Sequence, residues 1–417
     1  MINLNQKSVL LLGIGGVSMH QLALCYLNLG YTVYGYDAKT STYTDIVTKA
    51  GALFSTHFNK DFLHVNFCVK TGAIKDNNKY VVALKNLGVK ILDRAEALNE
   101  LFKNFKCVMA VAGTHGKSTT ASLIYEILRV AGKRVSCHIG ADVFAPRFNF
   151  GDDYLVVEAC EYNKSFLSLY PNISIITNVE AEHMDSYKTM FSLRSAFKTF
   201  LNRGKQRFVF KCESTNFLNK IKNITFVDSC NLNLKPKLIG DYNKHNISLA
   251  VSVCQSLGVS DAVITKVVNS FAGIPRRYEL IGTIQKQKIY IDYAHHPTEI
   301  NSFVTAFKNQ YKNSLIVFQP HTYSRTKLLL NQFLEVLKDI DNLIIFKEYP
   351  AREKPSQGMS ANEFYKQLKL INLKVKYCAS AKGVLKNLAN FDAVAFVGAG
   401  DINQIAKKIV KTIEKKC

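Results

Sequence analysis

The residues with the clearest chemical potential lie in one glycine-bearing stretch, Gly113-Thr-His-Gly-Lys-Ser-Thr-Thr120. An apolar run over 107–112 predicts a buried parallel strand before it, and apolar residues at helical spacing over 120–132 predict a helix after it. Glycines in such a turn let main-chain N–H groups approach an anion at the helix N-terminus, which makes the stretch a phosphate cradle. Lys117 would then reach the β- and γ-phosphates of ATP, and the Ser118 hydroxyl would contact Mg²⁺.

This stretch departs from the general phosphate-loop pattern. The pattern G-x-x-x-x-G-K-[ST] requires a glycine five residues before Gly116, and Val111 stands there. A glycine turn with a solvated lysine is therefore the alternative interpretation. The strand before the turn and the helix after it favour the nucleotide-binding interpretation.

Two further polar residues follow buried strands. Glu158 ends a predicted strand over 154–159, and His183 follows a predicted strand over 173–179. The carboxyl ends of parallel strands share one edge of a sheet, so we expect both side chains near Lys117 and Ser118. Either residue alone would more often be an ordinary hydrogen-bonded group at a strand end. Cys160 lies beside this edge, but no histidine and base arrangement supports it as a nucleophile.

The N-terminal region predicts a second nucleotide site. A strand over 8–12 runs into the turn Gly13-Ile-Gly-Gly-Val-Ser18, a helix follows, and a strand over 31–36 ends at Asp37. This is the opening of a Rossmann-like βαβ unit, with an acid where ribose hydroxyls are often held. The pattern alone fits NAD as well as other nucleotide diphosphates.

Polar strings also follow predicted strands in the C-terminal third. Asp292-Tyr-Ala-His-His-Pro-Thr-Glu299 follows a strand over 289–292, and Gln319-Pro-His-Thr-Tyr-Ser-Arg325 follows a strand over 315–318. Upstream, Gly240-Asp-Tyr-Asn243 precedes a predicted helix over 247–257, and Gly273-Ile-Pro-Arg-Arg277 marks a crossing between domains.

Taken together, these stretches resemble the Mur ligase family from Gly13 to Asp401, which covers nearly the whole chain. The string over 292–299 is similar to the branch of the family that adds L-alanine. Three positions differ from the forms that are usual in that branch. Ala-Cys-Glu-Tyr replaces an acid-rich stretch after Glu158, Tyr242 replaces a histidine, and Thr322 replaces an arginine that some relatives carry.

The resemblance implies an α/β protein of three domains. Residues 1–94 would form a Rossmann-like domain for the UDP-sugar, 95–274 a central P-loop ATPase-type domain with a parallel or mixed sheet, and 275–417 a Rossmann-like α/β domain for the amino acid. The implied reaction joins L-alanine to the lactyl carboxylate of UDP-N-acetylmuramate, at the expense of ATP and through an acyl phosphate, in peptidoglycan precursor synthesis.

The resemblance also assigns site residues, each by its position in this sequence. The expected ATP contacts are Gly113, Thr114, His115, Gly116, Lys117, Ser118, Thr119, Asn243, Arg277 and Asp292. The expected UDP-sugar contacts are Gly13, Gly15, Gly16, Ser18, Asp37, Thr71 and Ala73. The expected catalytic residues are Lys117, His295 near the attacking amine, and Arg325 at the amino-acid carboxylate. The expected Mg²⁺ ligands are Ser118, Glu158 and His183; histidine is an uncommon Mg²⁺ ligand, so His183 rests on the resemblance alone.

Composition narrows the class of protein. The formal charge is +22 over 417 residues, but the lysines are dispersed and no nucleic-acid-binding motif is visible, so we expect no nucleic-acid partner. No apolar run approaches the length of a membrane span, and the first strand begins too early for a signal peptide. Ten cysteines without a C-x-x-C pair indicate reduced thiols. We therefore expect a cytoplasmic monomer or homodimer that is not inserted in a membrane.

Two alternative functions remain open. The first is a related ligase with another acceptor, for example one that recycles murein tripeptide. The second is a regulator that binds nucleotide without catalysis, although such a protein would be expected to lose Lys117, Glu158 or His183, and all three are present.

Overall fold

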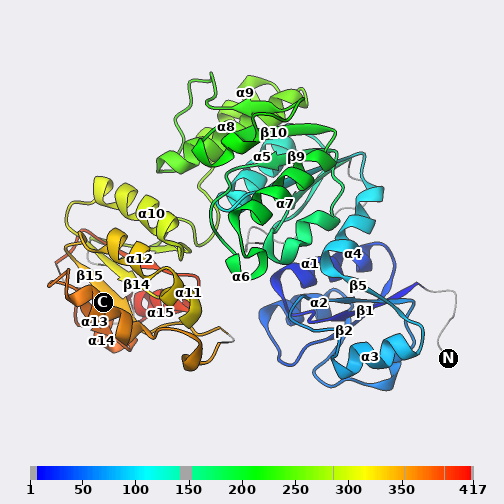
Figure 1. The fold of residues 1–417 in the computed structure, drawn as a ribbon, viewed down its shortest axis with the longest axis horizontal. Helices are drawn as coiled ribbons and strands as arrows, with labels where there is room; N and C mark the ends of the chain where they lie inside the picture. Colours follow the sequence, from blue (N-terminus) through cyan, green and yellow to red (C-terminus); the bar gives the residue numbers. More distant parts are fainter. Residues whose placement is uncertain (1–6, 141–152, 285, 352, 389, 415–417) are drawn as a thin grey trace. The chain divides into compact units, whose positions relative to one another are not determined.

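Three sheets of mostly parallel strands, each covered by helices, make up the chain (Figure 1). The computed structural model describes residues 7–140, 153–284, 286–351, 353–388 and 390–414. Two compact units can be separated. The first, Met1–Lys237 with Asn243–Phe271, holds two sheets, and the second, Leu238–Tyr242 with Ala272–Cys417, holds the third. The predicted three-domain α/β class is confirmed, whereas the borders at 94/95 and 274/275 stay predictions.

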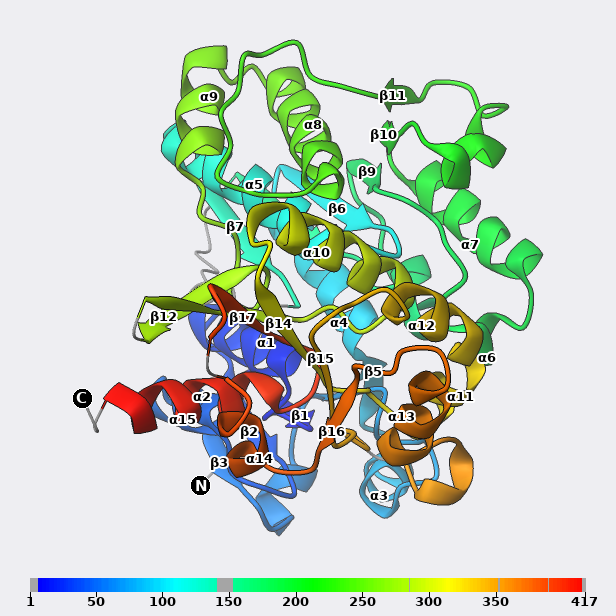
Figure 2. The ribbon, with the colours of Figure 1, turned by 90° about the vertical axis from the view of Figure 1, so that its left-hand side faces the viewer.

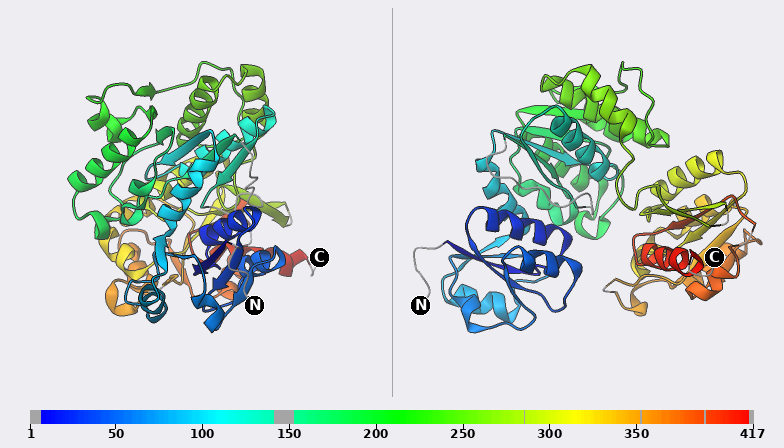
Figure 3. Two further views of the ribbon diagram at one scale, coloured as in Figure 1. Left: turned by 90° about the vertical axis from the view of Figure 1, so that its right-hand side faces the viewer. Right: turned by 180° about the vertical axis from the view of Figure 1, so that it is seen from behind.

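The first sheet has the strand order β3-β2-β1-β4-β5, and all of its strands are parallel. The strands are β1 (Ser8–Leu12), β2 (Thr32–Tyr36), β3 (Leu53–Ser55), β4 (Phe67–Lys70) and β5 (Lys90–Asp93). The helical segments are α1 (Val17–Asn28), α2 (Thr42–Lys49), η1 (Lys60–Leu63) and α3 (Lys79–Asn86). Val9 and Leu11 pack in the cluster of α1, whereas Leu10 and Leu12 pack in the cluster of α3, so helices cover both faces (Figure 3).

The second sheet has the order β11-β10-β9-β6-β8-β7 and is also parallel. The strands are β6 (Cys107–Ala112), β7 (Val135–His138), β8 (Tyr154–Glu158), β9 (Ile173–Ile176), β10 (Gln206–Phe210) and β11 (Thr225–Val227). The helical segments are α4 (Arg94–Leu101), η2 (Phe102–Asn104), α5 (Lys117–Val130), η3 (Tyr162–Ser168), α6 (Met184–Tyr187), α7 (Met190–Arg203), η4 (Glu213–Leu218), α8 (Asp241–Ser256) and α9 (Asp261–Ser270). Because β6 pairs with both β8 and β9, the segments that follow these three strands lie at one edge of the sheet.

The third sheet is mixed, with the order β12-β13-β17-β14-β15-β16 and an antiparallel pair at β12 and β13. The strands are β12 (Glu279–Ile284), β13 (Gln287–Asp292), β14 (Ser314–Phe318), β15 (Leu343–Phe346), β16 (Lys376–Cys378) and β17 (Ala393–Val397). The helical segments are α10 (Pro297–Gln310), α11 (Tyr323–Leu328), α12 (Leu330–Leu337), η5 (Pro355–Gln357), α13 (Ala361–Lys369), α14 (Ala381–Leu385) and α15 (Ile402–Glu414). Helices α10, α12 and α13 cover one face, and α14 and α15 cover the other (Figure 2).

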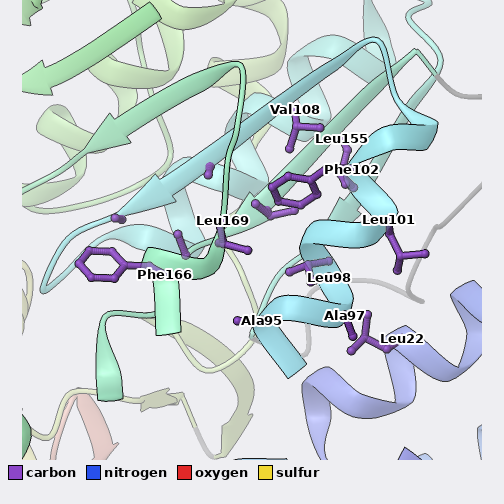
Figure 4. Packing of buried hydrophobic residues seen from close by; sticks show 14 of the residues in the cluster. Leu22, Ala95, Ala97, Leu98, Leu101, Phe102, Val108, Leu155, Phe166 and Leu169 are labelled. Carbon is purple, nitrogen blue, oxygen red and sulfur yellow. The ribbon is translucent and has the colours of Figure 1, made fainter. Parts of the chain in front are cut away.

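One hydrophobic cluster links the first two sheets. Leu98, Leu101 and Phe102 of the α4 segment are buried together with Leu22 of α1 and Val108 of β6 (Figure 4). The segment that joins the first two sheets is thus buried in a core that both sheets share. Burying each large apolar side chain contributes about 1.5–3 kcal/mol to the free energy of folding. The contacts of α4 therefore stabilise the packing of the two sheets in one unit.

Several element borders differ from the sequence prediction. Helix α5 begins at Lys117 instead of residue 120, strand β9 ends at Ile176 instead of residue 179, and α8 begins at Asp241 instead of residue 247. Apolar spacing sets the predicted borders, whereas the left-handed backbone of Gly116 sets the start of α5, and the polar groups of Thr177 and Asn178 that hold the phosphate loop end β9.

Candidate active site

The phosphate loop between β6 and α5 needs glycine at two positions. Gly113 has φ 145° and Gly116 has φ 81°, a region that residues with a side chain rarely adopt. A Cβ on Gly113 would collide with the Thr177 hydroxyl, and one on Gly116 would collide with the side-chain oxygen of Asn246. The main-chain N–H groups of the first turn of α5 follow directly, which is the arrangement that binds phosphate.

The segment after β9 braces this loop. The main-chain N–H groups of Thr114 and His115 donate to the main-chain and side-chain oxygens of Asn178, at 3.1 Å and 2.9 Å. The N–H of Glu180 donates to the Thr114 hydroxyl at 2.8 Å. No role was predicted for Asn178 or Glu180, although a polar string directly after a buried strand was a usable signal.

Lys117 is held inside the site. Its Nζ donates to the carbonyl oxygens of Gly113 at 2.6 Å and Thr114 at 2.9 Å, and lies 3.1 Å from Oε1 of Glu161. Burial by itself disfavours the lysine charge, but the carboxylates of Glu161, Glu182 and Glu158 outweigh it and raise the pKa of Lys117. The ammonium group is therefore charged where a nucleotide phosphate would arrive.

Glu161 is a site residue that sequence reasoning missed. It is 1% exposed, and its Oε2 is buried without a hydrogen-bond partner among the described residues. Burial raises the pKa of Glu161, against the opposing pull of Lys117 and His183. Its main-chain oxygen accepts a 2.6 Å hydrogen bond from the Tyr187 hydroxyl. Only the fold brings this carboxylate to Lys117, so the sequence offered no more than its position three residues after Glu158.

The three predicted metal ligands fall into two neighbouring groups. Ser118 donates its hydroxyl hydrogen to Oε2 of Glu158 at 2.8 Å, and Gly140 N–H donates to the same oxygen at 2.9 Å. His183 lies with Glu161 and Glu182, where one ligand atom of each residue falls within 4.8 Å of the others. This oxygen-rich set, including the unpaired Oε2 of Glu161, has the chemistry that Mg²⁺ prefers.

Most predicted UDP-sugar contacts meet at the carboxyl edge of the first sheet. Gly15 N–H donates to Oδ2 of Asp37 at 3.0 Å, and Gly13 packs against the Thr71 side chain. Gly16 caps the N-terminus of α1, and Ala73 is exposed in the turn after β4. The adjacent strands β2, β1 and β4 bring these three segments together.

Ser18 connects the first and second domains. Its hydroxyl accepts a hydrogen bond from Nη1 of Arg94 at 2.7 Å and lies 2.8 Å from Nε2 of His138, at the end of β7. Burial, aided by the charge of Arg94, lowers the pKa of His138 to about 3, so the imidazole is neutral. Contacts to Arg94 and His138 therefore hold Ser18 in place, close to the predicted UDP-sugar site.

The predicted ATP contacts are divided between the two compact units. Asn243 is buried in α8, where its Oδ1 accepts a 3.2 Å hydrogen bond from Asn246, and Asn246 contacts Thr120 of α5. Thr119 is buried in α5 of the same unit. Arg277 and Asp292 belong to the other unit.

In the second unit, a half-buried Arg277 and a buried Asp292 influence each other electrostatically. Arg277 lies 3.4 Å from Oε1 of Glu299 and over the ring of Tyr293. Asp292 accepts main-chain hydrogen bonds from Tyr278 at 2.8 Å and Ala294 at 2.7 Å. Burial nevertheless raises the pKa of Asp292 to about 6, against the charge of Arg277.

His295 and Arg325 gather around a third residue, His321. The His295 Nδ1 lies 3.0 Å from the carbonyl oxygen of Tyr293 and 3.3 Å from Oε2 of Glu299, and the His295 ring is 5.7 Å from that of His321. Burial, with the charges of His295 and Arg325, lowers the pKa of His321 to about 3. His321 belongs to the polar string over 319–325, but no role was predicted for it from the sequence.

The residue next to His321 carries backbone strain. Thr322 has φ 65° and ψ 147°, which is rare for a β-branched residue. Such outliers cluster at functional sites. The strained residue directly precedes α11, the helix that carries Arg325.

Family models match almost the whole chain, in the order of its three sheets. The description "Mur ligase family, catalytic domain" matches residues 9–106, "Mur ligase middle domain" matches 111–225, and "Mur ligase, glutamate ligase domain" matches 276–410.

Curated relatives of nearly equal length are similar to this chain. A UDP-N-acetylmuramate–L-alanine ligase of Acetivibrio thermocellus is 33% identical, over 97% of this chain and 96% of the relative. One of Caldicellulosiruptor saccharolyticus is 35% identical, over 96% and 97%.

Solved structures share the fold. A UDP-N-acetylmuramate–alanine ligase of Thermotoga maritima matches with a TM-score of 0.82 at 23% identity, over 98% of this chain and 100% of that one. A murein peptide ligase of Psychrobacter arcticus matches with a TM-score of 0.70 at 20% identity, over 98% of each chain. With three family models in sequence and relatives above 30% identity over nearly the full length, the chain belongs to the Mur ligase family.

Proposed function

We propose that this chain is an ATP-dependent ligase that joins L-alanine to the lactyl carboxylate of UDP-N-acetylmuramate. The observation that carries the proposal is the phosphate loop, in which a charged, buried Lys117 lies among main-chain groups that suit a triphosphate. Full-length relatives at 33% and 35% identity, which bear the name of this reaction, support the choice of substrates.

A carboxylate does not react with an amine, so the lactyl carboxylate must first be activated. A lactyl carboxylate oxygen attacks the γ-phosphorus of ATP, ADP leaves, and an acyl phosphate forms. Lys117 and the N–H groups at the start of α5 stabilise the charge of the phosphoryl group in transfer. The alanine amine then attacks the acyl carbon, the C–O bond to phosphate breaks, and inorganic phosphate leaves.

Mg²⁺ fits the donor groups beside Lys117. We propose that Ser118, Glu158 and His183 hold it, with Glu161 and Glu182 close by. The ion, when bound, supplies positive charge that offsets the phosphate oxygens. Carboxylate and hydroxyl oxygens are the main contribution of the protein to such a site.

The second unit is proposed to bind the amino acid. Arg325 offers a guanidinium group that suits the alanine carboxylate, and His295, which like Arg325 acts on His321, is proposed to contact the amine. Arg277 and Asp292 are proposed to contact ATP. We place the reaction in the cytoplasm, where ATP and the nucleotide sugar are available; no helix in the described part of the chain has the length and apolar character of a membrane span.

Phosphate release tests this function directly. Purified protein is given Mg²⁺-ATP with UDP-N-acetylmuramate and L-alanine, glycine, L-serine, a murein tripeptide or no amine, and product mass is read in parallel. We expect release that needs both substrates and yields the alanyl product. Turnover only with a peptide in place of L-alanine would identify a murein peptide ligase, and no turnover with any acceptor would indicate a nucleotide-binding regulator.

A further inference from the structure

A loop in the second unit presents an apolar tip to solvent. Leu370, Ile371 and Leu373 follow α13 and are 76%, 52% and 78% exposed. The other exposed large apolar side chains of the described residues lie singly along the chain. Three exposed aliphatic side chains within four positions are a local concentration that folding alone does not explain.

The tip is held rigidly by a buried residue between its apolar members. Asn372 is 6% exposed, and its Nδ2 donates to the carbonyl oxygens of Leu337 at 3.2 Å and Ile340 at 2.9 Å. Its Oδ1 accepts from the main-chain N–H of Lys374 at 3.1 Å, and its own N–H donates to the Leu368 carbonyl oxygen at 2.8 Å. With Asn372 anchored inward, its neighbours Ile371 and Leu373 are held outward.

Lysines are the only charged residues in the stretch of chain that carries this tip. Residues 364–391 contain six lysines and no aspartate or glutamate: Lys366, Lys369, Lys374, Lys376, Lys382 and Lys386. Asp341 pairs with Lys374 at 2.9 Å, whereas Lys369 donates to the carbonyl oxygen of Val375 and Lys376 to the side-chain oxygen of Asn387. Carbonyl and amide oxygens carry no net charge, so these contacts do not neutralise the charges of Lys369 and Lys376.

We propose that this basic tip, residues 366–376, docks peripherally on the anionic surface of a lipid bilayer. A bilayer offers anionic headgroups and an apolar interior in the same place, and apolar side chains flanked by lysines match both. A symmetric contact with a second copy would set lysines against lysines. Three aliphatic side chains are also too few for the core of a stable protein interface.

The chain contains no tryptophan, so one introduced at the tip is a unique reporter. Leu373→Trp is mixed with vesicles of phosphatidylglycerol and phosphatidylcholine, or of phosphatidylcholine alone, at low salt. We expect a blue shift of the emission with the anionic vesicles, and its loss at high salt. Leu87→Trp, at a position 60% exposed in the first sheet's domain, is the matched control and should not shift.

Vesicle co-sedimentation of the full chain completes the test. We expect Leu370→Ser/Ile371→Ser/Leu373→Ser to reduce the bound fraction at least fivefold, with an unchanged melting temperature, and Leu87→Ser to leave it unchanged. Equal binding to phosphatidylcholine vesicles, equal binding of the triple variant, or absence of binding would each overturn the proposal. A dimer in solution that the triple variant dissociates would also overturn it, in favour of a second copy.

Discussion

Lys117 and Glu161 define the chemistry of the site at the scale of single residues. The Glu161 side chain is 2% exposed and that of Lys117 14%, and Glu161 is the charged partner that stabilises the lysine in the chain without nucleotide. An arriving phosphate offers Lys117 a second anionic partner. The pair therefore keeps the ammonium group charged and in place before the nucleotide binds.

Removing one member of this pair leaves a buried charge without a partner, which costs about 3–5 kcal/mol. We predict that Lys117→Met abolishes ligation and lowers the free energy of unfolding by roughly that amount. Lys117→Met/Glu161→Gln removes both charges and is expected to recover most of the stability, though not the activity. Urea unfolding followed by circular dichroism compares the variants. A double variant that is no more stable than Lys117→Met would contradict the pairing.

Asp292 makes the stability of the second unit depend on pH. Its pKa rises from 3.8 to about 6 on burial, so the folded chain binds this proton more tightly than the unfolded chain does. The stabilisation is complete below about pH 4 and is lost as the pH rises through about 6. We predict that the unfolding free energy of Asp292→Asn, relative to the wild type, increases by about 2 kcal/mol between pH 4 and pH 7. A difference that does not vary with pH would refute this.

At the scale of elements, the sequence predicted most strands and the loops that follow them. Strands β1 and β6 have the predicted bounds because continuous apolar runs between polar turns leave little choice. The start of α5 was missed because its N-terminus is set by the left-handed conformation of Gly116, which apolar spacing does not report. Strand β9 ends early because Thr177 and Asn178 use their polar groups to hold the phosphate loop.

The candidate site could be predicted where one string of residues carries the chemistry. Lys117 and Ser118 follow directly from the glycine turn, and Glu158 follows from its strand. Glu161 and His321 could not be assigned from spacing, because their roles depend on neighbours that are distant in sequence, Lys117 and His295. Tertiary contacts between loops are what the sequence leaves undetermined.

Gly116 tests how strictly the phosphate loop depends on its backbone. We predict that Gly116→Ala reduces kcat/KM for ATP at least 100-fold, because the new methyl group displaces Asn246 and strains the start of α5. Gly132→Ala is the matched control, since Gly132 also has a positive φ of 74° but has open space around it. Steady-state kinetics should show normal activity for the control, which costs only about 1–2 kcal/mol of backbone strain. Equal losses in both variants would show that strain alone is responsible.

At the scale of the whole molecule, the proposed substrate contacts are carried by two compact units. The phosphate loop and the residues proposed to bind the UDP-sugar belong to the first, and His295, Arg325, Arg277 and Asp292 belong to the second. The proposed acyl phosphate must be kept from water until the amine attacks it, so we predict that the two units close when the substrates bind.

X-ray scattering measures this closure. We predict that the radius of gyration decreases when a non-hydrolysable ATP analogue and UDP-N-acetylmuramate are added together. Either ligand alone should give a smaller change. A radius of gyration that is the same with and without both ligands would argue against closure.

The central claim is an acyl phosphate at the lactyl carboxylate, and transfer of an oxygen isotope tests it most directly. UDP-N-acetylmuramate with ¹⁸O in the lactyl carboxylate is incubated with Mg²⁺-ATP, L-alanine and the enzyme, and the inorganic phosphate is analysed by mass spectrometry. The mechanism predicts one ¹⁸O atom in each phosphate released, because the carboxylate oxygen that attacks the γ-phosphorus leaves with it. Unlabelled phosphate, or label found in AMP, would contradict the mechanism.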